Sequence, residues 1–289
     1  MRIAQGWKDY ELLDASDGEK LERWGDIILI RPDPQAIWKT PKTNPMWKNA
    51  HARYIRSSKG GGSWDVFKNI PESWNISFED LTFEVKPMGF KHTGVFPEQS
   101  VNWQWLKNRI SAKHKPFNVL NLFAYTGGAT SACLSAGASV THVDASKGMV
   151  QRAKENARLS QVADKSVRWI VDDCEKFIQR EIRRGKKYDA VILDPPSYGR
   201  GTNGEVWQLE NNIYSFLKLC VDVCSDNFDF IMLNTYSAGL SPATMEYMLS
   251  DIFVSKFGGG TSSEEIGLPV TSGGGIFPCG STAFWTAEK

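Results

Sequence analysis

The apolar run at residues 188–193 places the strongest constraint on how this chain folds. Its residues, Tyr188-Asp189-Ala190-Val191-Ile192-Leu193, are followed directly by Asp194, Pro195 and Pro196. A short continuous apolar run is typical of a strand that is buried on both faces of a parallel sheet. Two consecutive prolines end such a strand, because neither can donate a backbone hydrogen bond. We therefore predict a central strand of an open α/β sheet with a carboxylate at its carboxyl end, where such sheets place their chemistry.

The residues of this turn fit one planar amine. Asp194 and the carbonyl of Pro195 can both accept hydrogen bonds from an exocyclic amine, while Tyr198 can stack on the ring that bears it. Holding the amine in this way frees its lone pair to attack an electrophilic methyl group. An isolated Asp-Pro-Pro turn more often ends a strand and nothing else. Here a nucleotide-binding pattern precedes it, and we therefore expect the catalytic residues to be Asp194, Pro195, Pro196 and Tyr198.

Composition sets broad limits on the protein. A chain of 289 residues with 41% hydrophobic content can bury a full core and suggests two domains. Lys and Arg number 34 against 33 Asp and Glu, so the net charge of +1 favours no particular partner. The five cysteines lack metal-ligand spacing, which predicts core thiols and no metal site. With no signal peptide and no apolar run near ~18 residues, we expect a cytoplasmic protein that does not enter a membrane.

Residues 1–95 are expected to form a smaller β-rich domain. Eight of the eleven tryptophans lie in the first 105 residues, either as the core of a small domain or as exposed surfaces that stack on bases. Between Lys39 and Lys68, basic residues alternate with aromatic ones, which suits the phosphate backbone and exposed bases of RNA. A merely solvated loop fits the same pattern. We predict that this Trp-rich domain binds the substrate.

Residues 96–289 alternate apolar strands with helices, which indicates a mostly parallel, doubly wound sheet. The first strand, 117–123, runs into a glycine-containing segment at 124–130 and then a helix. The glycines let the backbone turn sharply and approach a ligand closely. The second strand, 139–144, ends in Asp144, and an acid at this place can accept both hydroxyls of a ribose.

A third strand, 167–171, is followed by Asp172 and Asp173. A carboxylate there suits the exocyclic amine of adenine, while Asp173 equally fits the N-cap of the helix that follows. Because the glycine pattern is not G-x-G-x-x-G, a dinucleotide is disfavoured and a nucleoside cofactor is favoured. The glycine turn, the acids after the second and third strands and the Asp194 turn together predict an S-adenosylmethionine-dependent methyltransferase domain.

From about residue 86 to its end, the chain resembles a family of class I methyltransferases that includes enzymes of large-subunit ribosomal RNA. The residues that carry the resemblance are 91–99 (Lys-His-Thr-Gly-Val-Phe-Pro-Glu-Gln), 121–127 (Asn-Leu-Phe-Ala-Tyr-Thr-Gly), Asp172-Asp173 and 193–199 (Leu-Asp-Pro-Pro-Ser-Tyr-Gly). The resemblance implies a Rossmann-like seven-stranded class I methyltransferase sheet, preceded by the β-rich domain.

The resemblance also implies a cofactor site for S-adenosylmethionine. Thr93, Gly94, Phe96 and Gln99 would close one side of its pocket. The other residues that we expect to bind the cofactor are Asn121, Phe123, Ala124, Tyr125, Thr126, Gly127, Asp144, Ala145, Ser146, Asp172, Asp173, Cys174 and Asp194.

One departure from the family pattern bears on the chemistry. Relatives that methylate carbon 5 of cytosine carry a nucleophilic cysteine in the stretch that corresponds to residues 234–240, where this chain has Ser237. A serine without an adjacent base is a poor nucleophile towards a pyrimidine ring. We therefore expect methylation of an exocyclic amine of a base in ribosomal RNA. Alternatives are a methyltransferase that acts on a protein or a small molecule, a nicotinamide oxidoreductase on the same fold, and an RNA-binding protein with a lapsed catalytic site.

Overall fold

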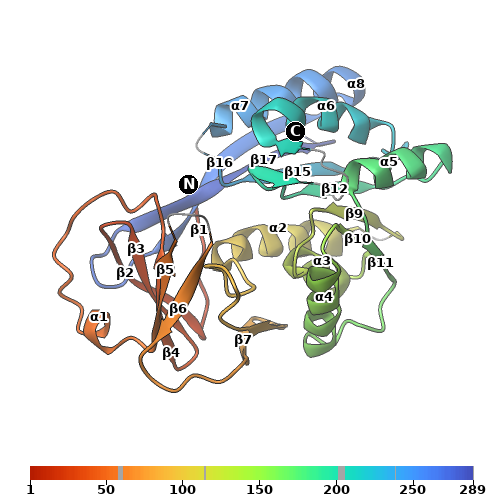
Figure 1. The fold of residues 1–289 in the computed structure, drawn as a ribbon. Coiled ribbons are helices and arrows are strands. Elements are labelled where there is room, and N and C mark those ends of the chain that lie inside the picture. The colour runs from red at the N-terminus through yellow and green to blue at the C-terminus, as the bar shows by residue number, and fades with distance from the viewer. Residues whose placement is uncertain (58–60, 114, 201–205, 238, 289) are drawn as a thin grey trace. The chain divides into compact units, whose positions relative to one another are not determined.

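The computed structural model describes the whole chain except residues 58–60, 114, 201–205, 238 and 289 (Figure 1). The chain forms two compact units. The sheet unit contains Met1, Asn102–Ile266 and Gly280–Lys289. The N-terminal unit contains Arg2–Val101 and Gly267–Cys279.

A large mixed sheet carries the strands that the apolar runs predict. Its order is β1-β16-β17-β15-β12-β9-β10-β11. The pairs β12–β15, β12–β9, β9–β10 and β10–β11 are parallel, with β11 at the edge of the sheet, and β17 is antiparallel to β15. The predicted α/β class is therefore confirmed, with the two-residue strand β1 added beyond the seven expected. The strands are β1 (Arg2–Ile3), β9 (Asn118–Leu122), β10 (Ser139–Asp144), β11 (Val167–Val171), β12 (Ala190–Leu193), β15 (Phe230–Thr235), β16 (Gly260–Pro269) and β17 (Ile276–Thr286).

Helices cover both faces of this sheet because its strands are apolar on both sides (Figure 1). Successive residues of one strand enter different cores: Leu120 packs with α5, α6 and α7, whereas Val119 packs with α2, α3 and α4. The helices are α2 (Ser100–Ser111), α3 (Gly128–Ser135), α4 (Lys147–Leu159), α5 (Cys174–Arg183), α6 (Leu209–Val221), α7 (Pro242–Leu249), the π-helical turn η2 (Ser250–Val254) and α8 (Ser255–Phe257). A short hairpin of β13 (Tyr198–Arg200) and β14 (Val206–Gln208) precedes α6.

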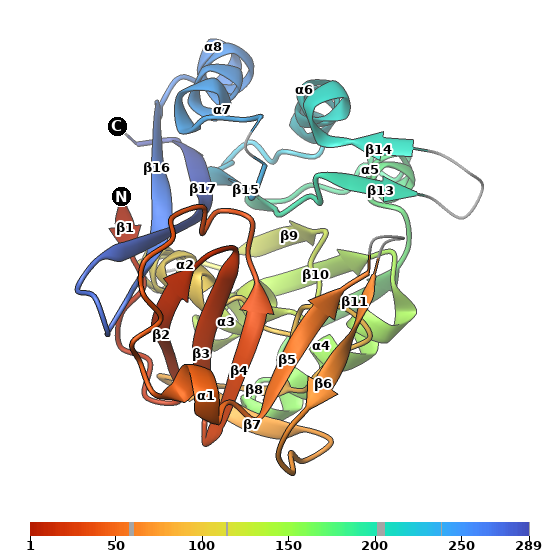
Figure 2. The ribbon, with the colours of Figure 1, turned by 60° about the vertical axis from the view of Figure 1, so that its left-hand side comes forward.

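The N-terminal unit is built on a five-stranded sheet of order β2-β3-β4-β5-β6, together with the hairpin β7–β8 (Figure 2). Neighbouring strands of this five-stranded sheet are antiparallel except β4 and β5, which are parallel. The elements are β2 (Tyr10–Ser16), β3 (Glu19–Trp24), β4 (Ile27–Pro32), α1 (Met46–Asn49), β5 (Ala52–Arg56), β6 (Gly62–Val66), β7 (Trp74–Phe78), β8 (Leu81–Val85) and the 3-10 turn η1 (Pro97–Gln99).

The tryptophans of the N-terminal unit are largely structural. Trp24 is fully buried, four other tryptophans are half-buried, and Trp38 is exposed. The four half-buried residues and Trp38 each have an indole N–H that donates within the unit. The acceptors are the Pro97 carbonyl for Trp7, the Ala15 carbonyl for Trp38, Asp14 Oδ2 for Trp47, the Met88 carbonyl for Trp64 and the Trp24 carbonyl for Trp74. An indole that is bonded in this way holds loops to strands. The structure therefore favours a role in the core of the domain over a role as exposed surfaces that stack on bases.

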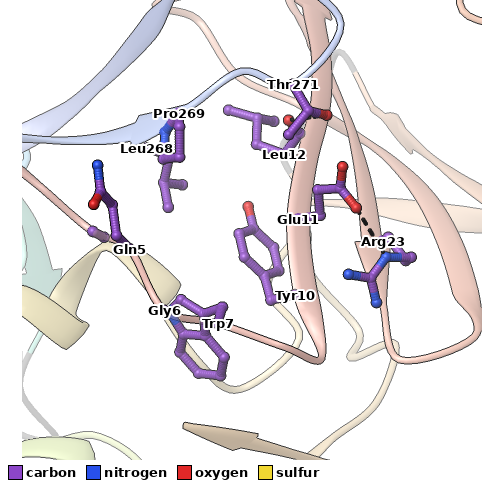
Figure 3. A pocket seen from close by; sticks show the side chains of 11 residues that line it. Gln5, Gly6, Trp7, Tyr10, Glu11, Leu12, Arg23, Leu268, Pro269 and Thr271 are labelled. Carbon is purple, nitrogen blue, oxygen red and sulfur yellow. Dashed lines mark hydrogen bonds and ion pairs between the residues drawn. The ribbon is translucent and has the colours of Figure 1, made fainter.

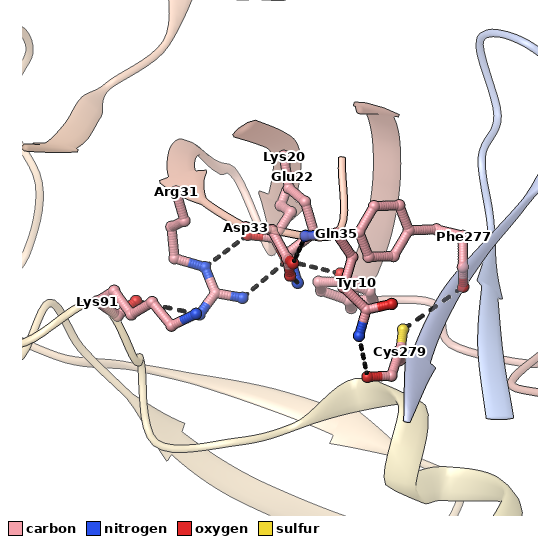
Figure 4. A network of polar contacts seen from close by, with 9 residues as sticks. All are labelled: Tyr10, Lys20, Glu22, Arg31, Asp33, Gln35, Lys91, Phe277 and Cys279. Atoms are coloured by element: carbon pink, nitrogen blue, oxygen red, sulfur yellow. Dashed lines mark hydrogen bonds and ion pairs between the residues drawn. The ribbon is translucent and has the colours of Figure 1, made fainter. Parts of the chain in front are cut away.

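A network of buried charges lies across β3 and β4 (Figure 4). Arg31 donates to both carboxylate oxygens of Glu22, with N–O distances of 2.5 and 2.7 Å, and Tyr10 Oη donates to the same carboxylate at 2.8 Å. Lys20 Nζ lies 3.8 Å from Glu22 and 3.1 Å from Asp33. Burial alone would raise the pKa of Glu22, but Arg31 and Lys20 lower it to about 2. Glu22 is thus a compensated buried anion.

The tip of the long β16–β17 hairpin belongs to the N-terminal unit, whereas the sequence placed residues 96–289 in one domain. The Thr271 amide donates to the Leu12 carbonyl at 3.1 Å, and Gln35 Nε2 donates to the Cys279 carbonyl at 3.1 Å. These bonds join residues more than 200 positions apart, so no local pattern could indicate them.

Candidate active site

The turn after β9 has the backbone geometry of a ligand-binding loop. Phe123 and Tyr125 adopt positive φ angles of 54° and 48°, which side chains other than glycine rarely adopt, and Gly127 has a φ of 80°. Such strain persists where the surrounding structure fixes it, often at functional sites. Here Cys174 Sγ accepts from the Phe123 amide at 3.3 Å and Asn156 donates to the Thr126 carbonyl at 2.8 Å.

Asp144 stands at the carboxyl end of β10, directly beside this turn. Its carboxylate accepts from the Tyr125 amide and the Ser146 amide, both at 2.8 Å. Burial raises the pKa of Asp144, and these two amide bonds oppose the rise. A carboxylate has about four lone-pair sites, so two amides leave room for the diol of a ribose. The residues therefore fit a nucleoside cofactor.

The acids after β11 divide their roles. Asp173 caps α5, because its Oδ1 accepts from the Lys176 amide at 2.9 Å, which confirms the N-cap interpretation. Asp172 forms an ion pair with Arg180 of the same helix, and its amide donates to the Asp144 carbonyl at 3.1 Å. Asp172 is the acid of the pair that stands next to Asp144.

Other predicted cofactor residues have diverse surroundings. Asn121 is buried, and its amide donates to Thr130 Oγ1 at 2.9 Å, between the strand and α3. Cys174 is buried under the turn, and burial raises the pKa of its thiol. Ala124 is buried, whereas Ala145 is exposed. Cys174 thus supports the loop through the Phe123 amide, and the roles of Asn121 and Cys174 at the cofactor stay predictions.

The segment 91–99 lies in the N-terminal unit, where the charge network supports it. Arg31 Nη1 donates to the Lys91 carbonyl at 3.1 Å, and the Thr93 carbonyl accepts from the Lys86 amide at 3.0 Å. Thr93, Gly94 and Gln99 are buried, and Phe96 is half-buried against His92, with ring centroids 5.0 Å apart. The role of these four residues at the cofactor stays a prediction.

The Asp194 turn follows β12, the neighbour of β9 in the sheet. Asp194 Oδ1 accepts from Asn234 Nδ2 at 2.8 Å, and Pro195 is buried. Pro196 is exposed, and Tyr198 is 51% exposed at the start of β13, where its ring is accessible to a base. The carboxylate is therefore anchored, and the ring of Tyr198, four residues later, is accessible; their joint role at an amine stays a prediction.

Trp207 of β14 is a residue that the sequence interpretation missed. Its indole N–H donates to the Pro196 carbonyl at 2.7 Å. Its ring packs against Phe123, with centroids 5.2 Å apart. Trp207 thus joins the Asp194 turn to the loop after β9. The only local signal was an aromatic residue shortly after an Asp-Pro-Pro turn, which by itself indicates no partner.

Ser237 has a carboxylate neighbour that the sequence did not reveal. Its Oγ donates to Glu210 Oε1 in a short hydrogen bond, and it accepts from the Gly239 amide at 3.2 Å. The expectation of a serine without an adjacent base is therefore wrong. The bond from Ser237 lowers the pKa of Glu210, which makes this carboxylate a weaker base. Glu210 thus positions the Ser237 hydroxyl but activates it little as a nucleophile.

A cavity of about 230 Å³ opens in the N-terminal unit (Figure 3). Trp7, Tyr10, Glu11, Arg23 and Leu268 line it, and Arg23 is held by Glu11 at 3.1 Å. None of the predicted site residues lines it. Among the described residues, no group of His, Cys, Asp and Glu could hold a metal ion, and no helix is long and apolar enough to cross a membrane.

Gly127→Ala is expected to damage the cofactor loop. A Cβ at this position would lie 2.9 Å from Ala153 Cβ, and a φ of 80° costs an alanine about 1–2 kcal/mol. We expect the free energy of unfolding to fall by about 2–4 kcal/mol, with weaker S-adenosylmethionine binding by calorimetry. Gly137→Ala is the matched control, because Gly137 has a φ of 95° and open space around its Cβ position. Equal losses in both variants would show that close packing at Gly127 is unimportant.

Comparison with known proteins agrees with this geometry. Residues 39–217, more than half of the chain, match the model of the S-adenosylmethionine-dependent methyltransferase family. A crystal structure of an S-adenosylmethionine-dependent methyltransferase from Agrobacterium tumefaciens has a TM-score of 0.93 at 37% identity, over 99% of this chain and 93% of that chain.

Curated relatives are similar over a shorter span. The ribosomal RNA large subunit methyltransferase K/L of Shewanella frigidimarina is 30% identical over 154 residues, which are 53% of this chain and 21% of the relative. The ribosomal RNA large subunit methyltransferase I of Aeromonas salmonicida is 35% identical over 107 residues, 37% of this chain and 26% of the relative. The chain thus spans only about a quarter of these relatives. Together with the strand-end acids and the glycine turn, the matches show that this chain belongs to the family of S-adenosylmethionine-dependent methyltransferases.

Proposed function

We propose that this enzyme methylates an exocyclic amine of a base in RNA, with ribosomal RNA as the substrate. The observation that carries the proposal is the anchored carboxylate of Asp194 at the end of β12, followed four residues later by the exposed Tyr198. The names of the ribosomal RNA methyltransferases to which the chain is similar support RNA as the acceptor. The serine at position 237, in place of a cysteine nucleophile, supports amine over carbon methylation.

When bound, S-adenosylmethionine supplies the electrophilic methyl group. Asp144 and the loop at 123–127 bind the nucleoside part of the cofactor. Asp194 and the Pro195 carbonyl each accept a hydrogen bond from the amino group of the base. These two bonds direct the nitrogen lone pair away from the turn. Tyr198 stacks on the base, and a target within a helix must first be flipped out at a cost of a few kcal/mol. The proton that the amine loses on methylation can be accepted by Asp194.

We also propose that the N-terminal domain, residues 1–95, contributes to RNA binding. Lys48 and Arg56 are exposed, and Phe67 is exposed beside β6. Other cations of this segment are partly neutralised, because Lys42 and Arg53 both contact Glu19 at 2.7 Å. Exposed and neutralised cations are thus both present among the described residues of this segment, and we expect moderate, salt-dependent RNA affinity.

The proposal is tested by incubating the purified protein with tritiated S-adenosylmethionine and large-subunit ribosomal RNA from unmodified ribosomes, with total protein as a second acceptor. We expect label in one RNA fragment and an N-methylated nucleoside after digestion. Label on carbon 5 of cytosine would contradict the amine assignment. Label in protein alone would contradict an RNA substrate.

A further inference from the structure

A chain of side-chain hydrogen bonds leads from α2 to the Asp194 carboxylate. Asn102 Nδ2 donates to Thr282 Oγ1 at 3.0 Å, Thr282 Oγ1 donates to Asn234 Oδ1 at 2.9 Å, and Asn234 Nδ2 donates to Asp194 Oδ1 at 2.8 Å. All four residues belong to the sheet unit. The elements involved are α2 and the adjacent strands β17, β15 and β12, which can be followed in Figure 1.

The chemistry of the groups fixes the direction of every bond in this relay, which consists of Asn102, Thr282 and Asn234. A side-chain NH₂ can only donate, so Thr282 Oγ1 accepts from Asn102. Thr282 then donates its single hydroxyl hydrogen to Asn234 Oδ1. This orients the Asn234 amide with its NH₂ towards Asp194. Asp194 thus faces a donor that cannot accept, which favours the ionised carboxylate.

The relay is costly to bury and has no evident packing purpose. Asn102 and Thr282 are 0% exposed and Asn234 is 1% exposed, and burying polar side chains costs free energy unless they are hydrogen-bonded. Asn234 and Thr282 are register partners on β15 and β17, at the point where the strand changes from Phe230–Leu233 to polar residues. Fully satisfied buried polar networks specify one arrangement of their members. Here the arrangement ends on Asp194.

We propose that Asn102, Thr282 and Asn234 are positioning residues that hold Asp194 as an oriented, ionised acceptor and thereby select an amine-bearing base. The inference rests on the proposed function, in which Asp194 receives the hydrogens of the target amine. An ionised carboxylate recognises a ring that donates from an amino group. A ring with a carbonyl at that position presents an acceptor instead and is repelled. The relay therefore restricts the substrate to adenine, cytosine or guanine and excludes uracil.

The kinetic test uses the same tritium assay with unmodified large-subunit ribosomal RNA. We expect Thr282→Val to lower kcat about tenfold or more and to leave the KM for S-adenosylmethionine within about twofold, because the cofactor loop keeps its contacts. Thr282→Ser restores the hydroxyl and should recover most of kcat. Thr141→Val, at a buried threonine on β10, is the matched control and should keep kcat. Equal kcat values for Thr282→Val and Thr282→Ser would contradict the relay.

A second measurement does not depend on the substrate. In ¹⁵N-labelled protein, the side-chain amide protons of Asn234 should exchange at least about tenfold more slowly than those of the exposed Asn227, and about tenfold faster in Thr282→Val than in the wild type. If wild-type protein transfers no methyl group to RNA, the proposed function fails. The exchange rates still test whether Thr282 holds the Asn234 amide in the relay. An unchanged exchange rate of the Asn234 side-chain amide protons in Thr282→Val would overturn the proposed relay.

Discussion

Asp194→Ala is expected to reduce kcat for methyl transfer by about 10²–10³-fold, because it removes the group that orients the target amine and is placed to accept its proton. The carboxylate is held at 2.8 Å by Asn234, so it is already oriented before the substrate binds. We expect the dissociation constant of S-adenosylmethionine to change far less than kcat. Single-turnover methylation and calorimetry measure the two effects separately.

A matched carboxylate provides the control for this variant. Asp226 is exposed, lies in the same unit and precedes β15 at its amino end, whereas Asp194 lies at the carboxyl end of β12. Asp226→Ala should therefore leave both kcat and cofactor affinity unchanged. A kcat for Asp194→Ala within about tenfold of the wild-type value would show that Asp194 does not act in the catalytic step.

Arg31→Met is expected to destabilise the N-terminal unit by about 3–5 kcal/mol, because it leaves Glu22 as a buried anion without its main partner. Glu22 is 0% exposed and receives two hydrogen bonds from Arg31. The double variant Glu22→Leu/Arg31→Met should recover most of the loss, since no uncompensated charge remains. Arg53→Met is the control, because its ion pair with Glu19 is half-exposed and worth at most about 1 kcal/mol. Urea unfolding measures all three.

The same pair predicts how stability depends on pH. The pKa of Glu22 is lowered from its ordinary 4.5 to about 2, since Arg31 and Lys20 outweigh the effect of burial. A lowered pKa in the folded state contributes stability that is complete above about pH 4.5 and is lost as the pH falls towards 2. Wild-type protein should therefore lose stability across this window. The double variant should lose less, and an identical acid transition in both would contradict the charged state of Glu22.

Much of the fold could be predicted because its signals are local. The apolar run before Asp194 and the glycine turn after the first strand each lie within a few residues, and strands β9, β10, β11 and β12 appear at those places. Asp144 was expected at the end of a strand, and the structure places it at the end of β10, where two backbone amides hold its carboxylate. Such signals need no knowledge of strand order.

The missed residues depend on contacts between distant parts of the chain. Trp207 meets Phe123 only because β12 lies beside β9, and Glu210 meets Ser237 across 27 positions. A buried asparagine such as Asn234 has an unremarkable sequence context until β17 brings Thr282 next to it. The local pattern at each of these positions fits several partners equally well.

The sequence by itself therefore determined the α/β class, the S-adenosylmethionine-dependent chemistry and the strand ends at which acids stand. The fold class follows from hydrophobic periodicity and the strand ends from the backbone limits of glycine and proline, while the cofactor follows from the glycine turn and the acids at those ends; all these signals act over a few residues. The tertiary structure alone decided which side chains support those acids: Asn234 for Asp194, and the Tyr125 and Ser146 amides for Asp144. Side-chain partners of this kind are set by sheet order and register, which bring together residues that are far apart in the chain.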